Sequence, residues 1–409
     1  MEWGLAGIVL TAFRIGSVKS WVEVSERRLT ANYRLLAETA GAEITVLGVV
    51  KADAYGHGAE VCAPVLVRAG AKWLGVTDAA EGMAVRRALA GAEVSVLVMS
   101  GLLGDEAEAV VQHSLTPVVW NRQQMEWLAE AAERCGSGPV AVHLEIDSGM
   151  ARQGVAAGEE LCELLEWLRG QKKIVLDGVM THFASAEVAG SAQTLAQQGR
   201  FEEAMWLVED AGFRPAWVHA GNSSTLDNNG DATQSLGWLR SIAAGCGARA
   251  MVRSGLGLYG YCLPIEGDHG AAQVRNELLP VMTWKTRVIG VRDVQAGETV
   301  GYNATFVAQR TMRLALVPVG YADGLRRELS GSNTAAGGWM IVQGQRAAIV
   351  GRVSMNLTIV DVSGIPDVAV GDEVVVLGDG ITADDHALLA RTIAYEIVCG
   401  VRSAAHLMP

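Results

Sequence analysis

The sequence predicts an α/β fold in which an N-terminal (β/α)8 TIM barrel is followed by a mostly-β C-terminal domain. A chain of 409 residues is too long for one ordinary core, so two or three domains are expected. From about Ser25, short β-branched runs alternate with amphipathic stretches, which is typical of buried parallel strands covered by helices. After about Glu277, strands follow one another with Gly- and Asp-bearing turns between them and little helix.

Each barrel strand is expected where a short apolar run lies between turn residues. The expected strands are Ile44 to Val50, Trp73 to Val76, Val94 to Met99, Leu115 to Trp120, Val140 to Ile146, Ile174 to Met180, Trp217 to His219 and Ala250 to Arg253. Helices are expected over Gly58 to Arg68, Ala79 to Leu89, Arg122 to Glu133, Glu159 to Arg169 and Ala192 to Ala211. A count of eight strands favours a closed barrel, and an open doubly wound sheet is the alternative.

We expect the barrel to span residues 21–273 and the β domain to span residues 274–409, with Val274 to Pro280 as the linker. Residues 1–20 form an N-terminal extension, for which packing on the β domain is one option. The expected strands of the β domain are Val281 to Val291, Met312 to Val319, Met340 to Val342, Ala347 to Val350, Leu357 to Val362 and Glu373 to Leu377, and a helix is expected over Ala383 to Leu389. The Asn- and Gly-rich stretch Leu226 to Gly247 makes a long connection in which an insertion could lie.

The composition excludes several classes of protein. The formal net charge is −12, and the sequence contains no lysine- or arginine-rich run, which argues against binding to nucleic acid or anionic membranes. The six cysteines are scattered without a C-x-x-C pair or a histidine at ligand spacing, so we expect reduced thiols in a cytoplasmic protein and no metal site. The apolar stretch Leu5 to Phe13 is too short for a membrane span and lacks a preceding basic region, so no signal peptide is expected.

The most informative residue is Lys51, which ends an apolar strand and opens the run VVKADAYGHG (Val49 to Gly58). Burying an unpaired ammonium costs several kcal/mol or more, so a lysine in such a place often has a lowered pKa or is held covalently. A lysine of this kind can attack a carbonyl group and form a Schiff base. The plainer interpretation, a strand-end lysine that reaches water, is the commoner one for an isolated lysine.

Polar residues collect at the C-terminal ends of the expected strands, where a (β/α)8 barrel carries its active site. They are Lys51 and Tyr55 after the first strand, Arg152 after the fifth, His182 after the sixth, Asn222 and Ser223 after the seventh, and Arg253 and Gly255 after the eighth. Taken singly, each has a structural explanation: His182 as a hydrogen-bonded core histidine, Ser223 as a helix cap, Arg152 as a partner of Asp147. Because all of these residues are expected on the same rim of the barrel, together they favour an active site there.

The loops after the seventh and eighth strands commonly form the phosphate site of such a barrel. Gly221-Asn222-Ser223 and Ser254-Gly255-Leu256 offer glycine backbone amides and a serine hydroxyl, which suit an anion. A Schiff-base lysine beside a phosphate site indicates pyridoxal 5′-phosphate (PLP). A sugar-phosphate aldolase is the competing assignment, but it would usually keep its lysine on a middle strand and would not need the β domain.

These motifs resemble the alanine racemase family, and the resemblance extends from about Val22 to Arg402. The motifs that follow the order of the family are VVKADAYGHG, THFAS, GNSS, the stretch from VRSG to YG, GYADG, GRVSMN and AYEIVCG. The resemblance implies a PLP enzyme that acts on a small amino acid. Lys51 would be the Schiff-base residue and one of two acid/base groups, and Tyr302 in VGYNATF would be the second.

The resemblance also implies binding roles. The cofactor would be held by Lys51, Tyr55, His182, Asn222, Ser223, Arg253, Gly255, Leu256 and Tyr395, with Arg253 at the pyridine nitrogen and His182 near the ring. Arg152 and the backbone of Met355 would receive the substrate carboxylate. In this family, Tyr302 and Met355 reach the barrel mouth of the neighbouring subunit, which implies a head-to-tail homodimer with two composite sites.

Two positions depart from the family pattern. Glu145 stands where many members carry a carbamylated lysine, and we hypothesise that it orients Arg152 through a water or a small shift. A solvent-facing Glu145 is the alternative. Asn356 replaces an aspartate that is common after the methionine, which removes one charge near the carboxylate pocket.

The sequence thus predicts a two-base racemase that interconverts L-alanine and D-alanine and supplies D-alanine for peptidoglycan. A serine racemase or a broad-specificity amino-acid racemase is the nearest alternative. A PLP-dependent decarboxylase is disfavoured by Arg253 and Tyr302, because it would place an acidic partner at the ring nitrogen. A non-catalytic PLP carrier could manage with the barrel alone, so the β domain disfavours it.

Overall fold

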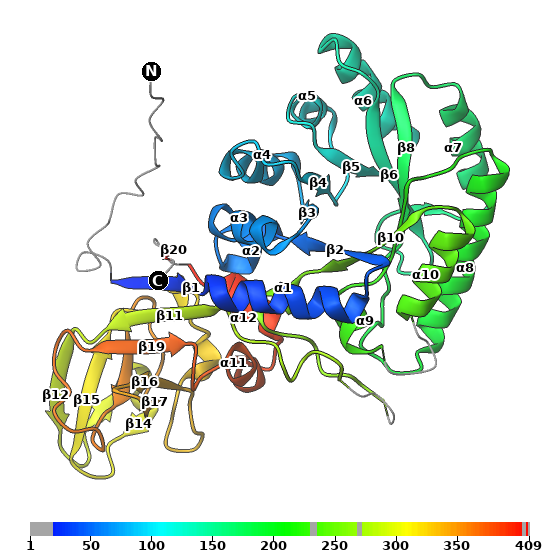
Figure 1. The fold of residues 1–409 in the computed structure, drawn as a ribbon. Coiled ribbons are helices and arrows are strands. Elements are labelled where there is room, and N and C mark those ends of the chain that lie inside the picture. The colour runs from blue at the N-terminus through cyan, green and yellow to red at the C-terminus, as the bar shows by residue number, and fades with distance from the viewer. Residues whose placement is uncertain (1–18, 230–234, 268–271, 403–405, 408–409) are drawn as a thin grey trace, which may run out of the picture. The chain divides into compact units, whose positions relative to one another are not determined.

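The computed structural model describes residues 19–229, 235–267, 272–402 and 406–407. Its chain divides into two compact units (Figure 1). The barrel unit runs from Ser25 to Val281, and the β unit combines the chain before Ser25 with the chain from Met282 onward.

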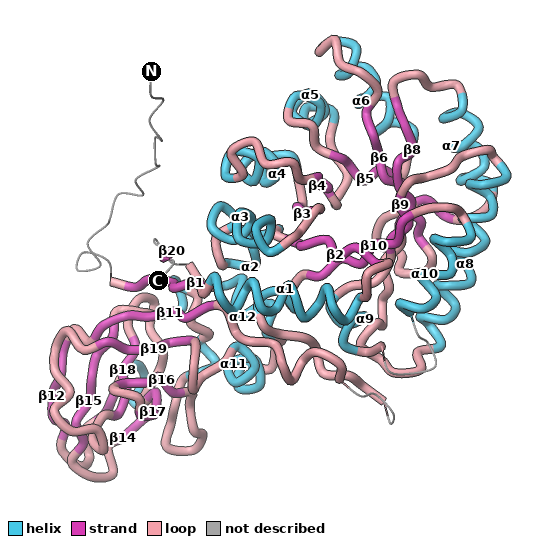
Figure 2. The backbone as a smooth tube through the Cα atoms, viewed as in Figure 1, coloured by secondary structure: helices cyan, strands magenta, loops and turns pink. Residues whose placement is uncertain are grey.

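The barrel unit is a closed ring of parallel strands. They are β2 (Ile44–Val49), β3 (Trp73–Val76), β4 (Ser95–Val98), β5 (Thr116–Val119), β6 (Val140–Asp147), β8 (Ile174–Met180), β9 (Trp217–His219) and β10 (Arg249–Ser254), and the short β7 (Val155–Ala156) adds to β6. Because β5 also pairs with β6, the ring closes, as the inner magenta strands of Figure 2 show. The predicted eight-strand barrel is confirmed, and the open doubly wound sheet is wrong.

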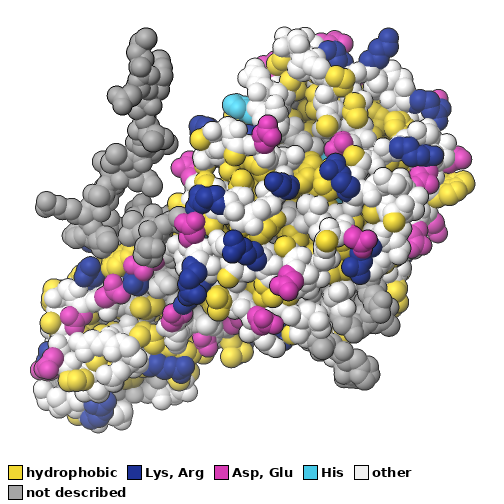
Figure 3. Space-filling model, viewed as in Figure 1, with side chains coloured by type: hydrophobic (Ala, Val, Ile, Leu, Met, Phe, Trp, Pro, Cys, Tyr) yellow, Lys and Arg dark blue, Asp and Glu magenta, His cyan; other side chains and the backbone are white. Residues whose placement is uncertain are grey.

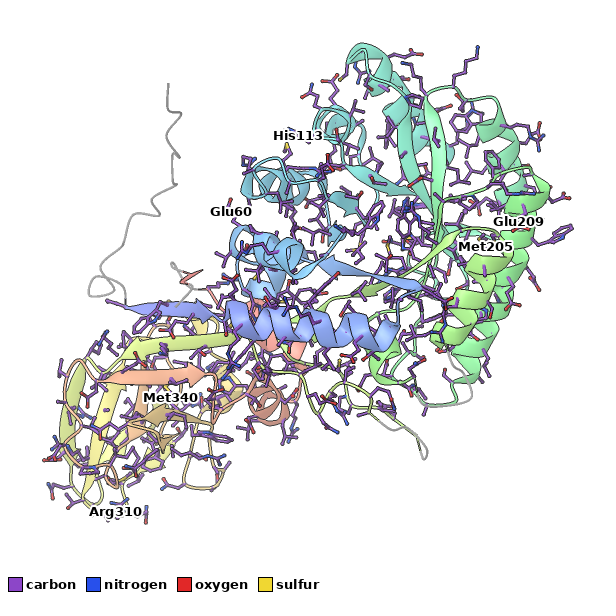
Figure 4. The ribbon with its side chains drawn as sticks, in the orientation of Figure 1. Glu60, His113, Met205, Glu209, Arg310 and Met340 are labelled. Atoms are coloured by element: carbon purple, nitrogen blue, oxygen red, sulfur yellow. The ribbon has the colours of Figure 1, made fainter. Side chains whose placement is uncertain are left out.

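Helices cover the outside of the barrel (Figure 1). They are α1 (Glu26–Ala40), α3 (Ala59–Ala69), α4 (Ala79–Ala88), α5 (Ala107–Gln112), α6 (Arg122–Arg134), α7 (Glu159–Arg169), α8 (Ala192–Asp210) and α10 (Ser235–Gly245), with the short turns α2 (Lys51–Gly56) and α9 (Ser223–Asp227). Side-chain caps start several of them, because the side chains of Asp78 and Ser191 accept from backbone amides of the first turns of α4 and α8. Met205, labelled in Figure 4, lies on the buried face of α8.

Aromatic and histidine rings fill the inside of the barrel. The ring of Trp73 lies 5.3 Å from that of His143 and 5.5 Å from that of Trp217. The rings of His143 and His219 are 4.9 Å apart. Since β3 pairs with neither β6 nor β9, the contacts of Trp73 cross the interior rather than run along the sheet. The barrel is therefore a packed core with polar rings inside it.

The barrel unit begins and ends later than the expected range of 21–273. Residues 274–281 are fastened to the barrel, because Asp227 Oδ1 accepts from the amides of Val274 and Arg275. The side chain of Asn32 likewise accepts from the amide of Leu279 and donates to its carbonyl. The expected linker is thus part of the barrel. At the other end, residues 21–24 lie in the β sheet, where their backbone pairs with Met282 to Lys285.

The β unit is a largely antiparallel sheet in the order β12-β15-β18-β17-β16-β19-β11-β1-β20. Its strands are β1 (Ser20–Val24), β11 (Met282–Arg287), β12 (Gly290–Val294), β15 (Met312–Val317), β16 (Trp339–Val342), β17 (Gln345–Ile349), β18 (Thr358–Asp361), β19 (Glu373–Leu377) and β20 (His406–Leu407), with the small hairpin β13 (Thr299–Val300) and β14 (Phe306–Val307) beside it. The helices α11 (Ala383–Ala390) and α12 (Ala394–Gly400) complete the unit. Met340, labelled in Figure 4, is fully buried in this unit.

One expected strand needs correction, and two other expectations lie wholly or partly outside the described residues. The single strand expected over Val281 to Val291 is two strands, because the amide of Val288 bonds to Asp372 while that of Ile289 bonds to Leu316, so the chain changes partner. The connection Leu226 to Gly247 contains the end of α9 and all of α10, and residues 230–234 within it lie outside the described residues. Residues 1–18 of the expected N-terminal extension also lie outside the described residues.

The surface carries mixed charge. On the face drawn in Figure 3, basic and acidic side chains are interspersed over both units. Within the described residues, no helix is both long and apolar enough to cross a membrane. The same part of the chain contains no cluster of three or more His, Cys, Asp or Glu side chains that could hold a metal ion.

Candidate active site

Lys51 lies directly after β2, at the start of a left-handed turn. The next four residues, from Ala52 to Tyr55, all have positive φ between 51° and 55°. None of them is glycine, and each L-residue in this conformation costs roughly 1–2 kcal/mol relative to the right-handed form. Strain of this kind persists only where the surrounding structure imposes it, and it concentrates at functional sites.

Side chains around the turn impose this conformation. The carboxylate of Glu81, on α4, accepts from the amide of Ala52 at 2.7 Å and from the amide of Thr77 at 2.7 Å. Asp53 Oδ1 accepts from the amide of Ala59 at 2.7 Å, which joins the turn to α3. Nδ1 of the buried His57 lies 3.0 Å from the carbonyl oxygens of Ala54 and Tyr55 and donates toward them. Hydrogen bonds from three side chains, those of Glu81, Asp53 and His57, therefore fix the backbone that follows Lys51.

Replacing Ala52 with glycine tests the strain. Ala52 is exposed, so the substitution removes little packing. Glycine adopts the left-handed conformation freely but loses more entropy on folding, so Ala52→Gly should be neutral or stabilise by up to about 1 kcal/mol. The matched control is Ala31→Gly, at an exposed position inside α1, which should destabilise by about 1 kcal/mol. Urea unfolding of both variants measures the difference, and an equal loss of stability in both would show that the turn is unstrained.

A glycine-lined cradle lies at the ends of β9 and β10. The hydroxyl of the buried Ser223 accepts from the amide of Gly255 at 3.0 Å and from that of Gly257 at 3.1 Å. A Cβ atom on Gly255 would lie 2.2 Å from the hydroxyl oxygen of Tyr55, and one on Gly257 would lie 3.2 Å from Ser223 Oγ. The absence of a side chain at Gly255 lets the hydroxyl of Tyr55 approach, so that two hydroxyls and two amides converge around the buried Leu256. Converging donors of this kind suit an anion.

Ser223 is not a helix cap. That role belongs to Asn222, whose side chain accepts from the amide of Thr225 and so starts α9. Ser223 is the first residue of α9, and its hydroxyl is directed at the loop after β10. The structural explanation of Ser223 is therefore wrong, and Asn222 supports the cradle by fixing α9.

The buried Arg253 organises the histidines beside this cradle. It donates from Nη1 to Nδ1 of His219 at 3.1 Å, and from Nη2 to Nδ1 of His182 at 3.0 Å and to the carbonyl of Thr181 at 2.8 Å. Burial, and then the charge of Arg152, lower the pKa of Arg253 to about 10, so the guanidinium stays charged at neutral pH. Because a guanidinium has no acceptor, both Nδ1 atoms must be unprotonated.

His182 is held neutral. Burial is the main cause that lowers its pKa, to about 3, and the charges of Arg253, Arg152 and Lys51 lower it further. A neutral His182 that accepts at Nδ1 carries its proton on Nε2, and that proton is available to a neighbouring group.

Glu145 faces the interior rather than solvent, since its exposure is 2%. Its carboxylate accepts a hydrogen bond from Gln153, which also donates to the carbonyl of Met99. Burial raises the pKa of Glu145, although Gln153, Arg253 and Arg152 oppose this effect. The solvent-facing alternative is wrong. The hypothesis that Glu145 orients Arg152 stays a prediction, and Gln153 is a partner of Glu145 that the sequence did not indicate.

Arg152 is exposed on the loop after β6, and Asp147 shapes that loop. Asp147 Oδ1 accepts from the amides of Gly149, Met150 and Ala151 at 2.9, 2.9 and 3.1 Å. Burial raises the pKa of Asp147, but the three amides and the charge of Arg200 outweigh burial and lower it overall. Asp147 therefore serves the loop backbone, and Arg152 is an exposed cation of the same loop.

The β unit carries a separate group of exposed side chains. Tyr302, Met355 and Tyr321 are 66%, 57% and 43% exposed. Their loops touch, because a Cβ on Gly320 would lie 2.5 Å from the carbonyl oxygen of Met355, and one on Gly301 would lie 3.2 Å from the amide of Arg352. The loop 351–356 thus joins the segments that bear the two tyrosines. Tyr395 lies in α12 of the same unit.

The residues of the barrel mouth fit a phosphorylated, carbonyl-bearing cofactor. The cradle that a Cβ would fill offers amides and hydroxyls to a phosphate, Arg253 offers a fixed donor, and Lys51 offers an amine. Together with the β unit, this barrel defines the class of protein: an enzyme that holds a cofactor of this type at the mouth of a (β/α)8 barrel.

Comparisons with known proteins specify the family. Residues 24–262 match the family model "Alanine racemase, N-terminal domain", and residues 281–408 match "Alanine racemase, C-terminal domain". The chain belongs to the alanine racemase family. It is 36% identical to an alanine racemase of Syntrophobacter fumaroxidans over 386 residues, which cover 93% of this chain and 95% of that protein. It is an enzyme of this PLP-dependent family of isomerases.

Solved structures agree. The alanine racemase from Streptomyces coelicolor A3(2) superposes with a TM-score of 0.83 at 31% identity, covering 95% of this chain and 97% of that one. An alanine racemase from Bartonella henselae with covalently bound pyridoxal phosphate superposes with a TM-score of 0.78 at 24% identity, covering 96% and 99%. The latter likeness concerns the fold alone.

The structure therefore brings together most of the barrel residues that the sequence indicated. Tyr55, Ser223, Gly255 and Leu256 share the cradle, and Arg253 contacts His182 directly. Sequence reasoning missed Glu81, which holds the turn, and His219, which lies against Arg253. For His219, the available signal was a histidine inside the short apolar strand that directly precedes the GNSS motif.

Proposed function

We propose that this enzyme interconverts L-alanine and D-alanine with PLP bound at the barrel mouth. The observation that carries the proposal is the cradle of Ser223, Gly255 and Gly257 at the end of β10, which pairs with β2, the strand that Lys51 directly follows, on a barrel of the alanine racemase family. Lys51 would hold the cofactor covalently through its amine. Tyr55, Ser223, Gly255 and Leu256, supported by Asn222, would bind the phosphate, and we assign Tyr395 to the same role from the resemblance to the family.

The bound cofactor supplies an electron sink that makes the α-proton of an amino acid acidic enough to remove. Arg253 would face its ring nitrogen. Because the guanidinium is charged and surrounded by acceptors, it cannot readily give up a proton to that nitrogen. A weakened electron sink favours return of the α-proton over transamination and other side reactions. His182 would lie beside the ring as a neutral group.

Racemisation requires that a proton leave one face of the substrate and return to the other. We assign these steps to Nζ of Lys51 and to the phenolic oxygen of Tyr302, on opposite faces. Free lysine and tyrosine have pKa values near about 10.4 and 10, so both must be shifted toward neutrality in the complete site. The cationic groups of the barrel mouth would stabilise a tyrosinate. Whichever group removes the proton, the other must be protonated to return one.

Tyr302 and Met355 would act in the site of a second copy of the chain. Their exposure supports this, since apolar side chains on three touching loops of the β unit remain uncovered. A homodimer would bury them and would create two composite sites. The backbone of Met355 and the side chain of Arg152 would then bind the substrate carboxylate. Glu145 would orient the side chain of Arg152.

The substrate should be small. The tyrosines Tyr302, Tyr321 and Tyr395 would crowd the pocket and favour a methyl side chain. Serine differs from alanine by one hydroxyl, and an apolar pocket rejects such an analogue only by about 10²-fold at best. In the cell, we propose a cytoplasmic role in supplying D-alanine for peptidoglycan.

A racemisation assay of the purified, PLP-loaded protein tests the proposal. We expect interconversion of L- and D-alanine in both directions, serine turnover lower by up to about 10²-fold, and lysine turnover lower still. Comparable rates for alanine and lysine would indicate a broad-specificity racemase. Release of CO2 without racemisation would indicate a decarboxylase. Cofactor absorbance without any turnover would indicate a carrier.

A further inference from the structure

A series of imidazole and carboxylate contacts crosses the barrel interior from Arg253 to Asp177 on β8. Arg253 donates to Nδ1 of His219, and Nε2 of His219 lies 2.8 Å from Nδ1 of His143 on β6. Nε2 of His143 faces Oδ2 of Asp177 at 3.4 Å, and it forms no hydrogen bond within the described part of the chain. The His143 side chain is fully buried, whereas that of Asp177 is 29% exposed. The series therefore links the site to the outside.

The position of every proton along this series follows from Arg253. A guanidinium only donates, so Nδ1 of His219 must accept and the neutral ring must carry its proton on Nε2. That proton is donated to Nδ1 of His143, so His143 carries its own proton on Nε2, which faces Asp177. The opposite direction would require His219 to accept at both nitrogens, which a neutral imidazole cannot do.

The backbone of β8 is shaped to admit the ring of His143. A Cβ on Gly178 would lie 2.6 Å from Cγ and 2.7 Å from Cδ2 and Cε1 of that ring. The register between β6 and β8 also shifts here: Val142 pairs with Leu176, and His143 pairs with Gly178. Asp177 is thus the extra residue of a β-bulge. Bulges beside active sites commonly redirect a side chain, and this one brings a carboxylate to His143.

We propose that His143, backed by Asp177, is a positioning residue that holds His219 and, through it, the guanidinium of Arg253. The inference rests on the proposed function, in which Arg253 faces the ring nitrogen of the cofactor. A buried donor without an acceptor is unfavourable, so a His219 that lost His143 would leave its present orientation. Arg253 would keep Thr181 and His182 as partners but lose the contact that fixes Nη1.

The first test concerns the protein without cofactor. Two-bond ¹H–¹⁵N spectra of histidine-labelled protein should show His143 and His219 with the proton on Nε2 and a bare Nδ1. Single-histidine variants assign the signals. A proton on Nδ1 of either ring would overturn the proposal. Because this measurement needs no substrate, it remains decisive even if the protein catalyses another reaction.

The second test uses a matched pair of variants in the PLP-loaded enzyme. Asn and Leu are similar in size, but only Asn places an oxygen near the position of Nδ1. His143→Leu should lower kcat about tenfold, leave KM within about twofold because Arg152 binds the carboxylate, and shift the absorbance of the bound cofactor. His143→Asn should restore kcat to within about threefold of the wild type.

Two outcomes of the second test would contradict the proposal. One is wild-type kcat and absorbance in His143→Leu, and the other is an equal loss in His143→Leu and His143→Asn. If His143→Leu fails to fold, Gly178→Ala takes its place, because the added methyl group must displace the ring of His143. Gly178→Ala should then lower kcat with little change in KM, and wild-type kinetics in that variant would likewise overturn the proposal.

Discussion

Replacing Lys51 with alanine should abolish covalent cofactor binding and reduce racemisation by more than roughly 10⁴-fold, the upper end of what one positioned acid/base group contributes. The loss exceeds that range because Lys51 is proposed both to anchor the cofactor and to move a proton. The substitution should leave the fold intact, since the left-handed turn is held by Glu81, Asp53 and His57 rather than by Lys51 itself. Absorbance of the PLP-loaded protein and a racemisation assay measure the two effects.

Lys72→Ala is the matched control, because Lys72 is an exposed lysine that precedes β3. It should retain the cofactor absorbance and full activity. Borohydride reduction followed by peptide mapping should find the cofactor on Lys51 in the wild type and in Lys72→Ala. Retention of a covalent adduct in Lys51→Ala, or an adduct mapped to another lysine, would remove the basis of the proposed function.

The barrel could be predicted from the sequence because its signal is local. Each strand is a short apolar run between turn residues, and a strand such as Trp73–Val76 is buried on both faces, so periodicity and flanking residues suffice. The rim residues then followed from chain order alone. Every residue at the C-terminal end of a barrel strand lies on the same rim, which is why Arg253 and His182 could be grouped before any contact was known.

The details of the site depend on contacts between distant residues, which a pattern does not contain. The left-handed turn after Lys51 has no signature in the sequence, because alanines favour the right-handed helix and the hydrogen bonds of Glu81, Asp53 and His57 hold the opposite hand. The sequence left open whether Glu145 faces the interior or solvent, and it did not indicate the hydrogen bond that Gln153, eight residues later, donates to the carboxylate of Glu145. In both cases tertiary hydrogen bonds decide the outcome.

In the β unit, too, the sequence pattern did not predict pairing between strands that are far apart in the chain. Ser20–Val24 was not predicted as a strand of that unit, because its partner β11 lies more than 250 residues away. The stretch Val281 to Val291 shows a continuous strand pattern. Near Val288, however, its pairing partner changes, because β11 pairs with β19 and β12 pairs with β15. This change of partner cannot be recognised from the local sequence. Pairing between strands far apart in the chain was therefore beyond the reach of the pattern.

Replacing Tyr302 with phenylalanine should keep the cofactor and lower the rate of racemisation by roughly 10²–10⁴-fold in both directions, the usual contribution of a positioned acid/base group. The ring and its packing are retained, and only the phenolic oxygen that is proposed to carry the proton is removed. Tyr321→Phe is the matched control, since Tyr321 is exposed on an adjacent loop of the same unit and is assigned no proton. It should change the rate by less than about tenfold.

A two-base mechanism makes a further demand on the Tyr302→Phe variant. Lys51 remains able to exchange the α-proton on its own face, so in deuterated water one enantiomer of alanine should still incorporate deuterium without being converted into the other. A one-base mechanism predicts that exchange and racemisation fall together for both enantiomers. Mass spectrometry of each recovered enantiomer distinguishes the two cases. Equal loss of exchange for L- and D-alanine would contradict the assignment of Lys51 and Tyr302 to opposite faces, even if the overall rate fell as expected.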